Sequence, residues 1–400
     1  MAADGHITKR FASYGNESFK LGTSPIPPPV AFYCCHPHGR RPSPFNHDSH
    51  NSKRQHGAGD RCHWLHRLSC RRPASASWVH NPPLPCRRIE LTRARYNVRG
   101  TTRSKDKAEW MFQLFGSKYG ENRFDVYEVP DMIADTAFDE SVKGVAGIAH
   151  LASILSFSNN PDEVIPPTVK GTLNILKSAS KEPSVKSVVY TSSSTAVLLP
   201  EANKEMTVSK DTWNEKAIEM AYQPDPNGYV VYGVSKTMAE KAFWEAIEQT
   251  KPPFQTSAVL PNTNFGPILD GSEGTSTGSF PIKIWKGDTS MMSFIGPQYF
   301  VDVRDTARLH VAALIDPECD GQRIFAFAEP FNWADVIDIF KKIDPEGDFP
   351  APPENEGRDL SKIPNEDAVA LLQKHFGQGW VGLEESLREN VKGIDGLKVQ

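Results

Sequence analysis

The sequence has no long apolar run and few cysteines, and each shortage excludes a class of protein. No apolar stretch approaches the roughly 18 residues that a membrane-spanning helix needs, and the first residues lack the apolar core of a secretory signal. We therefore expect a cytoplasmic chain without membrane association. In that compartment the six cysteines stay reduced, which argues against a disulfide framework.

The two ends of the chain differ in charge. Residues 1–100 contain 16 Lys and Arg against 5 Asp and Glu, whereas residues 101–400 contain 29 against 44. Nine of the 12 histidines and five of the six cysteines also lie in the first hundred residues. Residues 1–93 carry proline clusters and neither a helical nor a strand period, so we expect most of this segment not to pack.

From about residue 94 onward, apolar strand patterns alternate with helical ones. This order predicts an α/β fold, a Rossmann-type doubly wound parallel sheet. We expect a nucleotide-binding core over 94–261, with 197–226 inserted toward the substrate, and a small substrate-binding lobe with returning core elements over 262–400. The predicted strands are 96–102, 124–129, 144–152, 185–191, 254–260 and 323–327, and the predicted helices are 104–118, 162–176, 228–249 and 332–342.

Tyr232 and Lys236 lie four residues apart at the start of a predicted helix, so they project from one face of it. A cation beside a phenol lowers the phenol's pKa, which makes Tyr232 a candidate proton donor to a carbonyl oxygen. The Thr-Ser-Ser-Ser cluster at 191–194 follows a buried strand, at the edge where doubly wound sheets bind ligands. Arg103 and Lys107 follow another strand, where Arg accommodates the 2′-phosphate of NADP.

These pieces, in this order, resemble the extended short-chain dehydrogenase/reductases, in the NAD-dependent epimerase/dehydratase family. The likeness is greatest to NADPH-dependent aldehyde and carbonyl reductases of fungi and yeasts and to dihydroflavonol-reductase-like ketoreductases. It covers residues 95–395, with YNVRGTTRS, GTLNIL, PSVKSVVYTSSS, VYGVSKTMAE and FVDVRDTARLH as its specific stretches.

The resemblance implies that the chain reduces a small ketone or aldehyde with NADPH, for example as a ketoreductase of secondary metabolism. It implies no nucleic acid as partner. It implies catalytic roles for Ser193, Tyr232 and Lys236. It implies cofactor contacts for Arg103, Lys107, Asp131, Met132, Leu151, Ala152, Tyr232, Lys236 and Pro261. The apolar residues available for a substrate pocket are Phe265, Phe280, Trp285, Met291, Met292 and Phe294, although core packing is the commoner fate of such residues. The oligomeric state, monomer or homodimer, stays open.

The family's opening strand and Gly-x-x-Gly-x-x-Gly turn, which receive the cofactor's pyrophosphate, have no counterpart in residues 1–95, where Gly57 and Gly59 come nearest. Codons permitted for AGDRCHWLHRLSC at 58–70, translated one base later, spell LVTGATGFIGSH, which is that strand and turn. Only the glycine contributed by Trp64 is forced. We therefore interpret residues 1–93 as the product of a shifted reading frame or a splicing error, which leaves the sheet without its first strand.

Other interpretations stay open. Cys62, His63, His66 and Cys70 are a candidate zinc set, although their order does not match known zinc spacings, and the paired arginines at 71–72 and 87–88 are candidates for nucleic-acid contact. The chain as written is alternatively a non-catalytic remnant without its phosphate loop. A third alternative is an NAD-dependent sugar epimerase or dehydratase, against which Arg103 argues.

The frame hypothesis predicts that genomic and transcript sequence across codons 53–95 contains a frame change or an unspliced intron. A transcript that encodes CHWLHRLSC without any frame change would contradict an annotation error and identify a natural variant.

Overall fold

The computed structural model describes residues 30–33, 96–269, 276–392 and 394, and for 30–33 the backbone alone. Seven parallel strands form the main sheet in the order β3-β2-β1-β4-β5-β6-β9. The predicted doubly wound parallel sheet is thereby confirmed. The strands are β1 (Val30–Tyr33), β2 (Val98–Thr102), β3 (Phe124–Glu128), β4 (Gly147–His150), β5 (Ser187–Thr191), β6 (Gln255–Pro261) and β9 (Gln322–Ala326).

The expectation that residues 1–93 supply no strand is wrong. β1 lies between β2 and β4 and pairs with both, so that Ala31 lies opposite Arg99 on one side and Ile148 on the other. Without it, the facing backbone groups of β2 and β4 would have no partners, and buried backbone groups are nearly always paired. The other features that the frame hypothesis uses, among them Gly57 and Gly59, lie outside the described residues.

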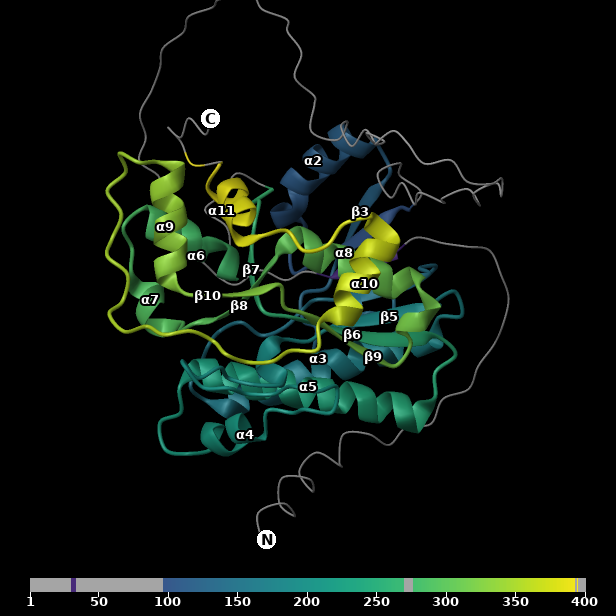
Figure 1. Ribbon diagram of the computed structural model, residues 1–400. Helices are drawn as coiled ribbons and strands as arrows, with labels where there is room; N and C mark the ends of the chain where they lie inside the picture. Colours follow the sequence, from purple (N-terminus) through teal and green to yellow (C-terminus); the bar gives the residue numbers. More distant parts are fainter. Residues whose placement is uncertain (1–29, 34–95, 270–275, 393, 395–400) are drawn as a thin grey trace, which may run out of the picture. The chain divides into compact units, whose positions relative to one another are not determined.

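Helices cover both faces of the sheet (Figure 1). α3 (Pro161–Lys181) and α5 (Gly228–Thr250) pack on one face, and α8 (Val303–Ile315) and α10 (Glu366–Phe376) pack on the other. The strands alternate accordingly: Val188 and Tyr190 of β5 belong to the first core cluster, and Val189 belongs to the second. Such strands are apolar on both faces, as a covered parallel sheet requires.

The helix predicted over 104–118 is split into η2 (Lys105–Ala108) and α2 (Glu109–Tyr119). No residue of α2 is buried, although its Phe112 and Phe115 rings contact Phe124 of β3, with centroids 5.5 and 4.9 Å away. The apolar side of α2 therefore packs on β3, at the edge of the sheet.

A smaller set of elements forms its own apolar cluster. A three-stranded sheet in the order β10-β8-β7 packs with α6, α7, α9 and α11 around the fully buried Trp333 and Phe340. The short α4 lies against α5 instead. The bounds are β7 (Thr263–Phe265), β8 (Gln298–Asp302), β10 (Glu329–Phe331), α4 (Glu215–Ala221), α6 (Phe280–Trp285), α7 (Ser290–Phe294), α9 (Trp333–Ile343) and α11 (Leu383–Val391).

Side-chain caps fix the starts of the main helices. The Asn227 side chain accepts a hydrogen bond from the Tyr229 amide, 2.7 Å away, and so sets the first turn of α5. Asn160 does the same for α3. Asn332, the first residue of the helix predicted over 332–342, forms a capping box with Asp335 at the start of α9. Such caps satisfy amides that the helix itself leaves open.

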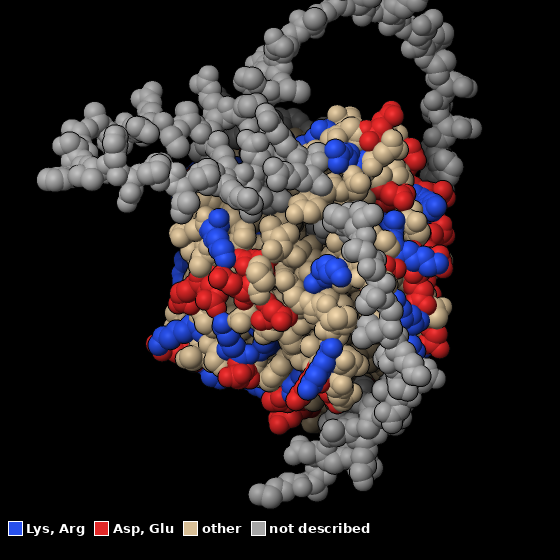
Figure 2. Space-filling model, turned by 90° about the vertical axis from the view of Figure 1, so that its right-hand side faces the viewer, with Lys and Arg blue, Asp and Glu red and all other residues tan. Residues whose placement is uncertain are grey.

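On the face of the molecule shown in Figure 2, acidic and basic side chains lie side by side around an area of uncharged residues. Some of the exposed charges of the protein form ion pairs, as between Lys143 Nζ and Glu140 Oε1, which are 2.6 Å apart. None of the described helices has the length and apolarity needed to cross a membrane.

The central position of β1 predicts that Ala31→Pro destabilises the fold. Proline removes an amide hydrogen from the ladder, and a buried acceptor left without its donor costs about 1–3 kcal/mol. Ala31→Gly keeps the amide and should cost about 1 kcal/mol or less. Urea unfolding measures both, and equal stabilities for the two variants would contradict the placement of β1.

Candidate active site

The predicted site residues gather at one edge of the sheet, where the parallel strands end. Ser193 follows β5 and caps the short helix η3 (Ser194–Ala196), and Tyr232 and Lys236 lie in the first turns of α5, which packs across that strand end. Lys236 reaches the end of β5 directly, as its ammonium bonds a carbonyl of Thr191. The sequence prediction that these three side chains share one site therefore has a structural basis.

Lys236 is 2% exposed, and its Nζ donates to the Thr191 carbonyl oxygen 2.7 Å away. The same atom lies 4.9 Å from the centroid of the Tyr190 ring, a cation–π arrangement. Burial lowers the pKa of Lys236 to about 7, and the carboxylate of Glu240 acts in the opposite direction. The ammonium therefore titrates near neutral pH.

Tyr232 is partly buried, and its phenol hydrogen-bonds with Ser193. Burial raises the pKa of Tyr232, and the hydrogen bond with Ser193 lowers it by less. This direction is the opposite of the one that the Tyr–Lys spacing suggested, because the Lys236 ammonium is directed to Thr191 rather than to the phenol. The phenol is thus protonated at neutral pH, as a proton donor must be.

The three hydroxyl residues at the end of β5 have three different partners. Thr191 Oγ1 lies 2.7 Å from Nε2 of His310 on α8, and Ser192 Oγ donates to Glu240 Oε2 on α5, 2.5 Å away. Ser193 Oγ accepts from Thr195 Oγ1 at 2.9 Å and hydrogen-bonds with Tyr232. The strand end is therefore fixed from both faces of the sheet.

His310 was not among the predicted site residues, although it ends the FVDVRDTARLH motif. Its Nδ1 lies 2.8 Å from the Thr306 carbonyl oxygen, which can only accept, so Nδ1 carries the proton. Nε2 then accepts from the Thr191 hydroxyl. Burial lowers the pKa of His310 to about 4, so the imidazole is neutral and serves as a fixed acceptor.

An aromatic group borders the phenol of Tyr232. The ring centroid of Phe157, in the loop after β4, lies 5.3 Å from that of Tyr232 and 6.1 Å from that of Phe294. The Phe294 ring is also 5.9 Å from that of Tyr229. Phe157 is 39% exposed and Phe294 41%, so both rings remain accessible beside the phenol.

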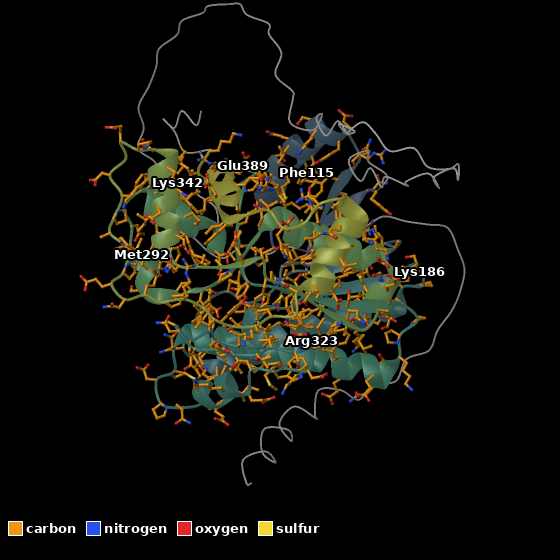
Figure 3. All side chains as sticks on the ribbon, viewed as in Figure 1. Phe115, Lys186, Met292, Arg323, Lys342 and Glu389 are labelled. Carbon is orange, nitrogen blue, oxygen red and sulfur yellow. The ribbon has the colours of Figure 1, made fainter. Side chains whose placement is uncertain are left out.

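Only one of the six residues suggested for an apolar pocket lies in this aromatic group, and that residue is Phe294. Phe265 and Met292 are buried in the second lobe's own cluster, where Met292 is labelled in Figure 3. The partly buried members packed against that cluster are Phe280, Trp285 and Met291. Phe157 was missed, because nothing in its local sequence distinguishes it from an ordinary loop residue.

The candidate cofactor residues follow successive strands along the same edge. Arg103, half-buried, comes directly after β2, and the exposed Lys107 lies in η2. Asp131 accepts from the Ile133 amide at 2.9 Å, and the Met132 carbonyl accepts from Asn174 Nδ2 at 3.1 Å. The remaining three lie at the ends of β4 and β6: Leu151, Ala152 and Pro261.

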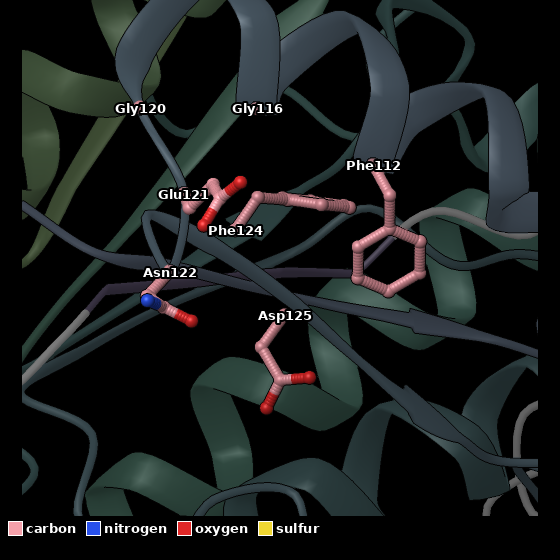
Figure 4. A pocket seen from close by; sticks show the side chains of 7 residues that line it. All are labelled: Phe112, Gly116, Gly120, Glu121, Asn122, Phe124 and Asp125. Carbon is pink, nitrogen blue, oxygen red and sulfur yellow. The ribbon is translucent and has the colours of Figure 1, made fainter.

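Two cavities open beside the helices α2 and α3. One, of about 550 Å³, opens between α2 and β3 and is lined by Phe112, Phe124 and Asp125 among others (Figure 4). The other, of about 430 Å³, runs along α3. Neither is lined by Ser193, Tyr232 or Lys236, so neither defines the reacting centre.

In the part of the chain that the structure describes, no three His, Cys, Asp or Glu side chains are grouped to hold a metal ion. The alternative zinc set of Cys62, His63, His66 and Cys70 and the arginine pairs at 71–72 and 87–88 lie outside the described residues.

Gly228 predicts how tightly the Phe157 loop packs on α5. A Cβ at position 228 would lie 2.1 Å from the Phe157 carbonyl oxygen, whereas at Gly116 on α2 it would meet nothing within 4 Å. We expect Gly228→Ala to destabilise the protein by about 1–3 kcal/mol, and Gly116→Ala to stabilise it by about 0.5–1 kcal/mol. Urea unfolding compares them, and equal stabilisation by both would show that the loop is not in contact.

Comparisons with known proteins bear on this arrangement. The family described as "Male sterility protein" matches residues 132–274. Aldehyde reductase 2 of Sporidiobolus salmonicolor is 38% identical over 303 residues, and ketoreductase adrE of Penicillium rubens is 40% identical over 302; each alignment covers 74% of this chain and 88% of the relative. The crystal structure of yeast methylglyoxal/isovaleraldehyde reductase Gre2, complexed with NADPH, superposes with a TM-score of 0.64 at 28% identity, covering 75% of this chain and 91% of Gre2. With this identity over most of two relatives and the Ser-Tyr-Lys group at the sheet edge, the chain belongs to the extended short-chain dehydrogenase/reductase family that contains these aldehyde reductases and ketoreductases.

Proposed function

We propose that the chain reduces a ketone or an aldehyde to an alcohol with NADPH, with Tyr232 as the proton donor. The observation that carries this proposal is the meeting of Ser193 and Tyr232 beside the buried Lys236 at the end of β5. A phenol whose pKa is raised holds its proton until an acceptor with a developing negative charge is beside it. A carbonyl oxygen under reduction is such an acceptor.

Ser193 orients the substrate in this proposal. Its Oγ accepts from Thr195 Oγ1 at 2.9 Å and from the Thr195 amide at 3.2 Å, so its own proton is available to another acceptor. The shared acceptor of Ser193 and Tyr232 is the substrate oxygen, and two donors on one oxygen fix the plane of the carbonyl. Lys236, where protonated, supplies positive charge close to the phenolate that forms after proton transfer.

The described residues fit NADPH at both ends of such a cofactor. Arg103 would meet the 2′-phosphate, with Lys107 beside it, and Asp131 and Met132 would meet the adenine. Leu151, Ala152 and Pro261 would line the remaining path to Tyr232 and Lys236. Bound there, the cofactor supplies the hydride. Residues for the pyrophosphate are not among those described.

Arg103 favours a reductase over an NAD-dependent sugar epimerase or dehydratase. The first residues after β2, Arg103, Ser104 and Lys105, include no acid, and an acid there is what the ribose hydroxyls of NAD usually meet. Aldehyde reductase 2 and ketoreductase adrE carry names of the same reaction class. The remnant alternative stays open for the chain as written, because its sequence has no glycine turn before β2 and residues 34–95 lie outside the described part.

The aromatic group beside Tyr232 favours an apolar carbonyl compound. Phe157 and Phe294 present exposed rings there, and such rings bind apolar surface. A keto ester, an aromatic aldehyde and a polyketide-like ketone of secondary metabolism all fit this chemistry. We further propose a cytoplasmic location. We also propose three parts of the chain: residues 1–93, the nucleotide-binding core 94–261 and the substrate-binding lobe 262–400, where β1 from the first part completes the sheet of the core.

The test is NADPH oxidation over a panel of keto esters and aromatic aldehydes. Tyr232→Phe should lower kcat/KM by about 100-fold or more, because the proton donor is lost, and should weaken NADPH binding, measured by fluorescence, far less. Tyr299→Phe is the matched control: it removes a tyrosine hydroxyl that donates to the Ser361 carbonyl oxygen at 2.9 Å, in the other lobe, and should retain activity.

The assay is run on the chain as written and on a version whose reading frame is restored across residues 58–93. Activity in the restored version alone would support the remnant alternative for the chain as written. Inactivity of both versions toward the whole panel would contradict the proposed function.

A further inference from the structure

A buried ion pair lies directly behind the candidate catalytic residues. Glu240 on α5 is fully buried, and Arg323 on β9 is 7% exposed. Arg323 Nε donates to Glu240 Oε1 at 2.7 Å, and its Nη2 donates to Oε2 at 3.2 Å. Arg323 lies on the α5 side of the sheet (Figure 3). Burying such a pair is costly and seldom adds stability, so its presence calls for another explanation.

Every acceptor position of the Glu240 carboxylate is used. In addition to Arg323, Ser192 Oγ donates to Oε2 at 2.5 Å, and Trp244 Nε1 donates to Oε1 at 3.2 Å. Ser192 is the residue immediately before Ser193. The carboxylate is thereby held in one orientation, and its contact with the active-site turn is direct.

Arg323 is held as firmly on its other side. Its Nη1 donates to the carbonyl oxygens of Lys210 and Thr212, 2.8 Å from each, and its guanidinium lies 4.0 Å from the centroid of the Trp213 ring. These contacts use both N–H groups of Nη1. The guanidinium is thus held beside Glu240 by contacts on both of its sides.

Glu240 is one helical turn after Lys236, on the same face of α5. The other titratable groups beside Lys236 among the described residues are Tyr190 on β5 and His150 on β4, and Tyr232 lies one turn before Lys236 on α5. The two phenols are neutral near pH 7, since burial raises the pKa of each. Burial lowers the pKa of His150 to about 3, so this imidazole is neutral as well. Glu240 is thus the anionic group in this set.

We propose that the Glu240–Arg323 pair is a positioning device that sets how readily Lys236 is protonated in its buried site, with Glu240 favouring the ammonium and Arg323 limiting that effect. Glu240 supplies the negative charge that offsets desolvation of the ammonium, and Arg323, with Ser192 and Trp244, holds that charge at a fixed place and prevents Glu240 from pairing with Lys236 directly. Lys236 therefore keeps its Nζ on the Thr191 carbonyl, ready for a bound ligand. The role of this pair in catalysis rests on the proposed function. Its effect on the charge of Lys236 does not, because it follows from the placement of Glu240 and Arg323.

The test measures the protonation of Lys236 by NMR in the full chain, labelled with [ε-¹³C]lysine and titrated without cofactor. The Lys236 signal is identified by its loss in Lys236→Met. The wild-type midpoint is expected near the pKa of about 7. Glu240→Gln, which keeps the shape and removes the charge, should lower the midpoint by about 1 pH unit or more, since a charge one turn away is lost.

Arg323→Gln is the second variant, and it should shift the Lys236 midpoint in the opposite direction. Removal of the guanidinium leaves the Glu240 charge without its offset, so the Lys236 midpoint should rise. Asp302→Asn is the matched control, because Asp302 is also fully buried and accepts two hydrogen bonds from the Arg304 side chain, at 2.8 and 2.9 Å, but is not among the groups acting on Lys236. Its midpoint should equal that of the wild type. Circular dichroism establishes that each variant is folded.

An unchanged midpoint in folded Glu240→Gln, or in folded Arg323→Gln, would overturn the proposal whether or not the chain is a reductase. In an active version of the chain, the alkaline fall of kcat should also occur at lower pH in Glu240→Gln than in the wild type. The shift should equal that of the Lys236 midpoint, and KM for the carbonyl compound should be unchanged. Absence of NADPH oxidation in the wild type would count against the proposed function only.

Discussion

The hydrogen bond from the Lys236 ammonium to the Thr191 carbonyl oxygen, 2.7 Å long, is the contact on which the rest of the site depends. It joins α5 to β5 at the point where the strand ends. Tyr232 lies one turn before Lys236 on the helix, and Ser193 lies two residues beyond Thr191 on the strand. Both are therefore placed relative to each other by a single bond, which replaces the water that a lysine with 2% exposure cannot reach.

Next to that bond, the consecutive hydroxyl residues Thr191, Ser192 and Ser193 each have a different hydrogen-bond partner. Thr191 donates to a neutral imidazole on α8, Ser192 donates to a carboxylate on α5, and only Ser193 faces the phenol. The first two bonds hold the strand end from opposite faces of the sheet. The third hydroxyl is thus presented from a turn that has little freedom left, which is what orientation of a substrate requires.

The main strands, the capped helix at Asn332 and the Ser-Tyr-Lys group were predictable, because period-2 and helical patterns and residue spacing are local properties of the sequence. The Glu240–Arg323 pair was not, since its members lie 83 positions apart and nothing local links them. Phe157 likewise meets Tyr232 only through the loop's path across Gly228. β1 was missed because its four residues follow a proline cluster and are too few to show a period.

The placement of β1 separates completion of the sheet from binding of the cofactor's pyrophosphate, two properties that the sequence analysis assigned to one missing segment. The three apolar clusters of the fold are made from residues at position 129 and beyond, and the Ser-Tyr-Lys group is built on β5 and α5 within them. In the described part of residues 1–95, the contribution to this part of the fold is β1, which completes the backbone ladder between β2 and β4. Affinity for a dinucleotide is different, because it depends on amides that can meet a pyrophosphate. An altered opening segment is thus expected to change cofactor affinity, whereas the contacts given above for Ser193, Tyr232 and Lys236 are made within β5, η3 and α5.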